Sequence, residues 1–213
     1  MSARHDAVRA GLGVGLAVGV SGLAFGAAAV TAGLSVAQAC ALSLFAFTGA
    51  SQFALAGVVA GGGALVPGVA GALLLGARNG LYGLRLAALL PTRLRAFTAH
   101  GVIDETSAVA FAHPAEARAG FYTTFASLYV TWNLTTLLAA VGASQVADPA
   151  MFGLDAVGPA TFLALLWPRL KESADDRKVA VAGAAIALAA TPFLPAGIPV
   201  LLAAAGALVV LVR

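Results

Sequence analysis

Charged residues are scarce in this 213-residue chain, where Asp, Glu, Lys and Arg together make up only 10% of the sequence. A water-soluble domain carries about 25% charged residues, because its surface has to be hydrated. Hydrophobic residues reach 61%, and the mean hydropathy is +0.95. The shortage of charge argues against a soluble globule and predicts that lipid is the solvent for most of the exterior.

Cysteine and histidine are also scarce, which limits the redox and metal chemistry open to the chain. Cys40 is the single cysteine, so an intramolecular disulfide is excluded. His5, His100 and His113 are scattered, with no spacing typical of a metal site. No phosphate-binding loop of the G-x-x-x-x-G-K type occurs either. We therefore predict no metal and no cofactor.

The net charge of +3 does not indicate a nucleic-acid partner. Lys and Arg are not gathered in one stripe; they lie at the edges of apolar runs, where cationic side chains meet lipid headgroups. This distribution predicts contact with a lipid bilayer and no binding of nucleic acid.

Long apolar runs dominate what is present. A membrane-spanning helix needs roughly 20 apolar residues. The candidates are 10–33, 36–60, 64–90, 120–142, 150–167, 178–194 and 197–212. The runs do not alternate with a period of two, which excludes a sheet. We therefore predict an all-α integral membrane protein, a single transmembrane domain over 1–213 built as a bundle of about seven helices, one or more broken by Gly or Pro.

Two polar segments, 91–119 and 168–178, interrupt the apolar runs and hold seven of the twelve Lys and Arg residues. Two spans separate them, so they share a side, which the excess of cations assigns to the cytoplasm. With three spans ahead of residue 91 the N-terminus lies outside, which conflicts with Arg4 and Arg9. A re-entrant segment around 46–62 would remove this conflict, and the sequence leaves both arrangements open.

Five glycines recur on one face of the first apolar run: Gly11, Gly15, Gly19, Gly22 and Gly26. Small residues at this spacing let helix backbones approach closely in lipid. A second stripe of small residues marks the third run: Ala72, Gly76, Gly80 and Gly83. Either the stripes predict close packing, within the chain or against a second subunit, or they reflect only the high glycine content of membrane helices.

Polar residues inside these runs are informative, because each costs free energy unless it faces protein or water. Thr48, Ser51 and Gln52 share one helical face beside Gly49. This predicts either interhelical hydrogen bonds or a helix that opens and offers donors to a ligand. On the fourth run a polar face next to Trp132 is typical of a helix turned toward a cavity: Thr124, Ser127, Thr131 and Thr135.

Arg78, Tyr82 and Arg85 lie on one face of the third run. An arginine at a helix centre costs about 2.5–3.5 kcal/mol on insertion scales. Arg78, with Asn79 beside it, therefore either pairs with a buried carboxylate or receives an anionic group. Asp155 is the carboxylate that lies well inside an apolar run. The sequence leaves four roles open for it: a helix cap, a partner for Arg78, an amine ligand or a proton carrier.

Asp104 and Glu105 belong to the polar segment 91–119, where a solvated surface is the default interpretation. They are the second place to look for a coupling carboxylate if Asp155 is only a helix cap.

Five stretches carry a resemblance to a known family: SGLAFG at 21–26, FTGASQF at 47–53, RNGLYGL at 78–84, DET at 104–106, and GLD at 153–155 followed by FLALL at 162–166. In this order, over roughly residues 10–170, they resemble the AzlC family of branched-chain amino-acid exporters. The sequence departs from the family pattern at Gly76, where asparagine is common, and at Asn79, where histidine or tyrosine is common.

The resemblance implies a secondary transporter subunit, not an enzyme, that exports leucine, isoleucine, valine or methionine through the inner membrane. It also implies coupling to the proton gradient and a small AzlD-type membrane subunit of about four spans. Alternatives are a transporter of another small amino acid or related solute, and a non-transporting assembly subunit.

A zwitterionic amino acid needs donors for its carboxylate and an acceptor for its amine, with apolar walls for its side chain. We therefore predict a substrate site from the polar and aromatic residues of these runs: Phe25, Thr48, Ser51, Gln52, Arg78, Asn79, Tyr82 and Trp132. Phe53 is a further wall, and Asp155 is the predicted proton-coupling residue.

Overall fold

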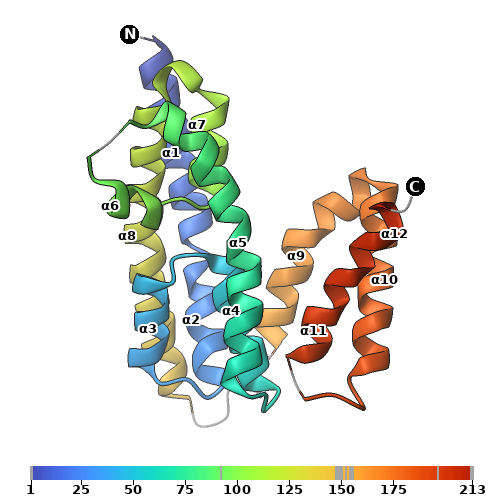
Figure 1. Cartoon of the computed structure of the whole chain (residues 1–213). Coiled ribbons are helices and arrows are strands. Elements are labelled where there is room, and N and C mark those ends of the chain that lie inside the picture. The colour runs from blue at the N-terminus through green and yellow to red at the C-terminus, as the bar shows by residue number, and fades with distance from the viewer. Residues whose placement is uncertain are drawn as a thin grey trace.

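The computed structural model describes residues 2–91, 93–146, 151, 153, 156–195 and 197–211. All regular elements in these residues are helices, which confirms the predicted all-α class (Figure 1). In chain order they are α1 (Ser2–Gly19), α2 (Gly22–Thr31), α3 (Val36–Phe45), α4 (Gly49–Ala60), α5 (Leu65–Leu89), α6 (Arg95–His100), α7 (Asp104–Ala112), η1 (Pro114–Glu116), α8 (Ala117–Ser144), α9 (Val157–Glu172), α10 (Ala174–Ala190), α11 (Ile198–Ala203), η4 (Ala204–Ala207) and α12 (Leu208–Leu211).

The glycine face of α1 and α2 packs along α8 over its whole length. A Cβ on Gly19 would lie 2.6 Å from Cβ of Thr131, and one on Gly11 would lie 2.9 Å from Oγ1 of Thr124. Only glycine allows helices to approach this closely. The predicted close packing is confirmed for this stripe, and the partner helix belongs to this chain. The second stripe is not closely packed, since a Cβ on Gly80 meets nothing within 4 Å and one on Gly83 comes no nearer than 4.0 Å to Val102.

Helices α3 and α4 form a hairpin in place of one straight span. The amide of Gln52 in α4 donates to the carbonyls of Leu42 and Ala46, both at 3.0 Å, so the chain reverses between the two helices. Glycines in the left-handed region make the turns at its foot, Gly33 with φ 98° before α3 and Gly62 with φ 68° after α4. Residues 36–60 therefore form a helical hairpin, and re-entry of the segment around 46–62 into a membrane stays a prediction.

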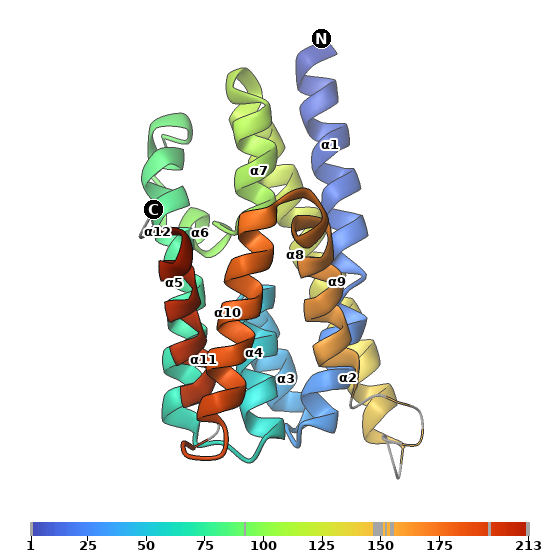
Figure 2. The same cartoon turned by 90° about the vertical axis from the view of Figure 1, so that its right-hand side faces the viewer.

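Helix α5 runs back along α4, with Gly68 against Leu55 and Val58. The short helices α6 and α7 follow at the end of the molecule where the N-terminus lies, and α8 returns beside α1 and α2 (Figures 1 and 2). Aromatic side chains fill the space between these helices, including Phe25, Phe47, Phe121 and Phe125.

Helices α9 to α12 form an antiparallel group beside this core (Figure 2). Helix α10 touches α11 and η4 closely, since a Cβ on Gly206 would lie 2.6 Å from the backbone nitrogen of Gly183. The group contacts the core mainly where α9 meets α2 and α4 and where α11 meets α5.

Two of the described helical segments are long and apolar enough to cross a membrane, Ser2–Thr31 and Pro114–Ser144. The predicted number of about seven spans stays a prediction. The hairpin reduces the number of helical segments that run the length of the core before residue 91 from three to two, α1–α2 and α5. The N-terminus therefore lies at the same end as the polar segments 91–119 and 168–178, and not at the opposite end (Figure 1).

Candidate functional site

A cavity of about 740 Å³ lies between four parts of the fold. These are the break between α1 and α2, the break between α3 and α4, the middle of α5 and the start of α7. Such a volume is within the usual range for small-molecule sites. Elements far apart in sequence contribute to its lining: Val18, Ser21, Thr48, Gly49, Ala50, Phe53, Leu75, Arg78, Asn79, Tyr82, Ile103, Asp104, Glu105, Trp132, Leu166 and Arg169.

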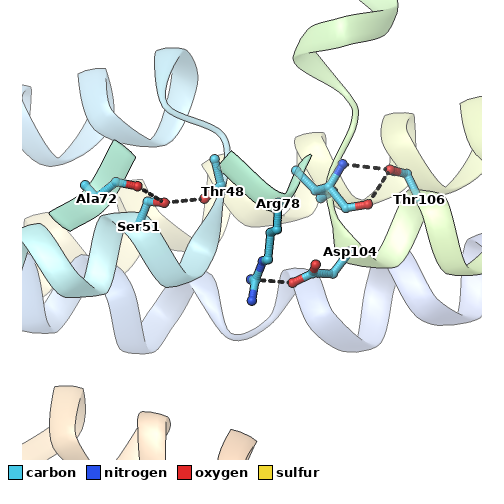
Figure 3. Close-up of polar contacts among 7 residues, drawn as sticks. Thr48, Ser51, Ala72, Arg78, Asp104 and Thr106 are labelled. Atoms are coloured by element: carbon cyan, nitrogen blue, oxygen red, sulfur yellow. Dashed lines mark hydrogen bonds and ion pairs between the residues drawn. The ribbon is translucent and has the colours of Figure 1, made fainter. Parts of the chain in front are cut away.

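The N-terminus of α4 opens onto this cavity. Thr48 is its N-cap residue, but the Thr48 side chain makes no capping hydrogen bond. Its hydroxyl donates to Oγ of Ser51 at 2.8 Å, and Ser51 donates to the carbonyl of Ala72 in α5 at 2.7 Å (Figure 3). The positive end of the α4 dipole therefore faces the cavity without a capping side chain, which favours a negative ligand group there.

Arg78 and Asp104 form an ion pair on the cavity wall, with 2.5 Å between Nη2 and Oδ2 (Figure 3). Thr106 fixes the start of α7, and with it Asp104: its buried hydroxyl accepts from the backbone N–H of Ile103 at 3.1 Å and donates to the carbonyl of Gly101 at 2.6 Å. The ion pair thus joins the middle of α5 to a firmly held turn.

Glu105 follows Asp104 at the N-terminus of α7. Burial raises the pKa of Glu105, and the charge of Asp104 raises it further, while a backbone hydrogen bond and Arg78 act in the opposite direction. Arg169 reaches the same cavity from α9. The polar part of the cavity therefore contains two cations and two carboxyl groups, one of which is held toward its protonated form.

The lining of the cavity also contains aromatic rings. Phe53 and Trp132 line the cavity and are buried, and both contact the fully buried ring of Phe25 behind them, at centroid distances of 5.6 and 6.2 Å. Nε1 of Trp132 and Oδ1 of Asn79 are buried without a hydrogen-bond partner in the part of the chain that the structure describes.

The chain matches the family model described as "AzlC protein" over residues 13–146, which covers more than half of the sequence and most of the cavity. It belongs to the AzlC family. AzlC is a transport-associated family, and together with the apolar helices this membership indicates a membrane protein. Searches among curated proteins and among solved structures found no match.

The structure brings together five of the eight residues predicted for the substrate site of this AzlC protein: Thr48, Arg78, Asn79, Tyr82 and Trp132. The other three lie behind the wall. Phe25 supports the aromatic rings, Ser51 connects α4 to α5, and Gln52 closes the hairpin. The predicted proton-coupling residue, Asp155, lies outside the described residues.

Asp104, Glu105 and Arg169 are the charged cavity residues that lie outside the substrate site predicted from the sequence. Asp104 and Glu105 were interpreted as solvated surface, although the DET stretch was among the family-like motifs. Arg169 was counted only as part of the polar segment 168–178. Helix contacts, and not local sequence, bring these side chains to the cavity.

The polar face of α8 is predicted from the sequence to face a cavity, but it does not line this one. Ser127 and Thr135 donate to the backbone carbonyls of Gly11 and Gly19 at 3.2 and 2.8 Å, so this face lies against the glycines of α1. Trp132, beside that face, is the residue of α8 that reaches the cavity.

Proposed function

We propose that this AzlC-family chain is the transport subunit of a secondary transporter that exports branched-chain amino acids across the inner membrane. The observation that carries the proposal is the cavity itself. Its lining combines opposite charges, from Arg78, Arg169, Asp104 and Glu105, with the aromatic rings of Phe53 and Trp132. This combination suits a zwitterion that has an apolar side chain.

The carboxylate of such a substrate would lie near Arg78 and the N-terminus of α4. A guanidinium group and backbone N–H donors at a helix N-terminus are both suited to a carboxylate. The ammonium group would bind Asp104, and the apolar side chain would lie against Phe53 and Trp132. Discrimination among leucine, isoleucine and valine would be modest, because one methylene is worth about 1–3 kcal/mol.

The direction of the helices supports a multi-pass topology with both chain ends in the cytoplasm. Six segments would cross the membrane, α1–α2, α5, α8, α9, α10 and α11–α12, and the α3–α4 hairpin would enter and leave from the outer side. The connections at that outer end, 32–35, 61–64, 145–156 and 191–197, contain no Lys or Arg. Cations are instead found on the segments at the N-terminal end, including Arg4, Arg9, Arg93, Arg95, Arg118, Arg177 and Lys178, as the positive-inside rule requires.

Glu105 is the carboxyl group best suited to carry the coupled proton. It lies in α7, outside the proposed crossing helices, and lines the substrate cavity. Burial raises the pKa of Glu105 toward neutral pH, which favours a group that binds and releases a proton during a transport cycle.

A small AzlD-type membrane subunit would complete the transporter. The glycine face of α1 and α2 is already occupied by α8, so the subunit would bind elsewhere on the apolar exterior. Several large side chains on α5 are exposed there, including Leu73, Leu81 and Leu84.

Leucine efflux from living cells tests the proposed function. Cells without their own branched-chain exporters would be loaded with leucine from a leucine-containing dipeptide, with the chain expressed alone or together with a small AzlD-type subunit. We expect the pair to lower intracellular leucine and to raise leucine in the medium. The Trp167→Phe variant, altered on the exposed face of α9, should behave like the wild type.

Unchanged efflux of leucine, isoleucine, valine and methionine with the pair present would contradict the proposed substrate class. A panel of the other neutral amino acids, measured in the same cells, would then show whether the chain transports a different solute. No efflux of any of them would favour an assembly subunit.

A further inference from the structure

We infer that the Arg78–Asp104 ion pair is a substrate clasp, which a zwitterion opens by replacing both partners at once. The substrate carboxylate takes Arg78 from Asp104, and the substrate ammonium takes Asp104 from Arg78. This inference rests on the proposed transport function and adds a rule of selection to it. Both a carboxylate and an ammonium group are needed on the same ligand.

The geometry of the pair leaves room for this exchange. One contact joins the two side chains, Nη2 of Arg78 to Oδ2 of Asp104 at 2.5 Å (Figure 3). The other carboxylate oxygen, Oδ1, is buried and has no hydrogen-bond partner among the described residues. A fork-shaped guanidinium usually binds a carboxylate through two parallel hydrogen bonds. A single contact is easier for a ligand to replace than such a fork, and the ammonium group would bind Oδ2, the oxygen that Arg78 releases.

The two partners come from different parts of the fold. Arg78 extends from the middle of α5, while Asp104 is held by the turn that Thr106 fixes. Both side chains line the cavity and are less than half exposed, at 44% and 42%. A ligand in the cavity can therefore reach both groups, and separating them changes the link between α5 and α7.

Charge balance explains why a singly charged analogue would bind poorly. A ligand with only a carboxylate would pair with Arg78 and leave Asp104 unpaired, and a ligand with only an amine would do the reverse. An ionised group left without its partner in a poorly hydrated site is strongly unfavourable. The partial exposure of the pair moderates this penalty through solvent screening.

The rest of the cavity leads to the same conclusion. Arg78 and Arg169 balance Asp104 and Glu105 when both carboxyl groups are ionised, and protonation of Glu105 leaves the four groups with a charge of +1. The balance therefore holds for the form in which Glu105 has released its proton. A zwitterion leaves this balance unchanged, whereas an anion or a cation shifts it by one charge.

Binding measurements on the purified full chain, in lipid nanodiscs and with its small subunit where this is needed for stability, test the clasp. The ligands are leucine, 4-methyl-2-oxopentanoate, which lacks the ammonium group, and 3-methylbutylamine, which lacks the carboxylate. We expect each analogue to bind the wild type at least about tenfold more weakly than leucine, a difference of about 1.4 kcal/mol.

The single variants should reverse this preference. In Asp104→Asn the guanidinium of Arg78 loses its partner, so the oxo acid should bind more tightly than it binds the wild type, while leucine binds more weakly. In Arg78→Gln the amine should gain in the same way. The matched control is the ion pair of Asp175 and Lys178, outside the cavity and joined at 2.8 Å. Asp175→Asn and Lys178→Gln should leave all three affinities unchanged.

The outcomes separate the clasp from the proposed function. If the wild type binds leucine and both analogues equally, the clasp is wrong and the transport proposal stands. If it binds no neutral amino acid, the transport proposal fails. Variants that lose all binding while folded, by their thermal transition, would assign the pair a structural role and overturn the clasp. For a variant that does not fold, Arg78→Lys or Asp104→Glu replaces it and should keep the preference for leucine over both analogues.

Discussion

Gln52 donates from Nε2 to the carbonyl oxygen of Leu42 at 3.0 Å, although ten residues separate them. In one continuous helix they would lie about 15 Å apart, because each residue adds about 1.5 Å. The same amide donates to Ala46 at 3.0 Å. Gln52 therefore satisfies two carbonyl groups at the end of α3 and holds the hairpin closed, and this reversal sets the direction of α5 and the helices after it.

Replacing Gln52 by Leu should destabilise the protein by about 1–3 kcal/mol, because the carbonyl of Ala46 would lose this donor and that of Leu42 would keep only the backbone N–H of Ala46 at 2.9 Å. The midpoint of thermal unfolding in detergent measures this. Gln145→Leu, altered at the exposed end of α8, is the control and should unfold like the wild type. Equal midpoints for the two variants would mean that the hairpin does not depend on this amide.

Gly19 and Gly13 lie on the same helix in opposite surroundings. A Cβ on Gly19 would lie 2.6 Å from Cβ of Thr131, whereas one on Gly13 meets nothing within 4 Å. Gly19→Ala should therefore cost about 1–3 kcal/mol through overpacking. Gly13→Ala should be neutral or stabilising by up to about 1 kcal/mol, since alanine favours helix. The yield of folded protein and its unfolding midpoint measure both, and a Gly19→Ala variant as stable as Gly13→Ala would contradict the α1–α8 packing.

The proposed topology predicts which positions face the outside of the cell. In a chain with Cys40 replaced by Ala, single cysteines at Ser2, Ala99 and Ala174 should resist a membrane-impermeant thiol reagent applied to whole cells. A cysteine at Gly61, in the turn between α4 and α5, should react. If Ser2→Cys reacts as well as Gly61→Cys, while Ala99→Cys and Ala174→Cys resist, residues 36–60 cross the membrane once. Labelling of Ala99→Cys or Ala174→Cys would reverse the orientation.

Glu105→Gln should change stability in a pH-dependent way. Because burial raises the pKa of Glu105 in the folded protein, the unfolded chain releases this proton first as the pH rises. The wild type should match the variant at pH values below the ordinary glutamate pKa of about 4.3. As the pH rises through the pKa of Glu105 in the folded protein, the wild type should become less stable than the variant. Above that pKa the difference in their free energies of unfolding should stay constant. If the wild type were destabilised relative to the variant mainly at low pH, the pKa of Glu105 would not be raised in the folded protein.

The same Glu105→Gln variant tests proton coupling. It should retain exchange of leucine across proteoliposome membranes but lose accumulation driven by a pH gradient. Glu116→Gln, altered in η1 outside the cavity, is the matched control and should keep both activities. Full gradient-driven accumulation in Glu105→Gln would place the coupling carboxyl group elsewhere, and Asp155→Asn would then be the next variant to measure.

Trp132→Phe tests whether the unpaired indole N–H serves a ligand. Nε1 of Trp132 is buried and has no hydrogen-bond partner in the described part of the chain, so loss of the N–H itself should cost little stability, while the smaller ring should lower stability through lost packing on Phe25. Substrate binding should weaken by about 0.5–1.5 kcal/mol, the net value of one hydrogen bond. Isothermal titration with leucine measures this, with Trp167→Phe on the exposed face of α9 as control. An unchanged affinity would leave the indole as a wall of the cavity only.

Local sequence was sufficient to predict the all-α class, the membrane environment, the family and the close-packed glycine face of the first helix. Each of these depends on features that are local or periodic along the chain. The shortage of charge requires lipid, and glycines spaced by three or four residues form one helical face wherever that helix packs. Arg78, Asn79, Tyr82 and Trp132 could be assigned to the site for the same reason, since polar and aromatic groups within apolar helices need a reason to be there.

Only the tertiary structure decided which groups meet. Whether 36–60 is one span or a hairpin depends on the amide of Gln52 reaching back to α3, and the side of the membrane proposed for the N-terminus follows from it. Asp104 and Glu105 read as solvated surface in the sequence, because their neighbours along the chain are polar. The turn fixed by Thr106 directs Asp104 to Arg78, 26 residues earlier, and α9 adds Arg169. Long-range helix contacts set such pairings, and a single sequence records the residue types but not the distances between them.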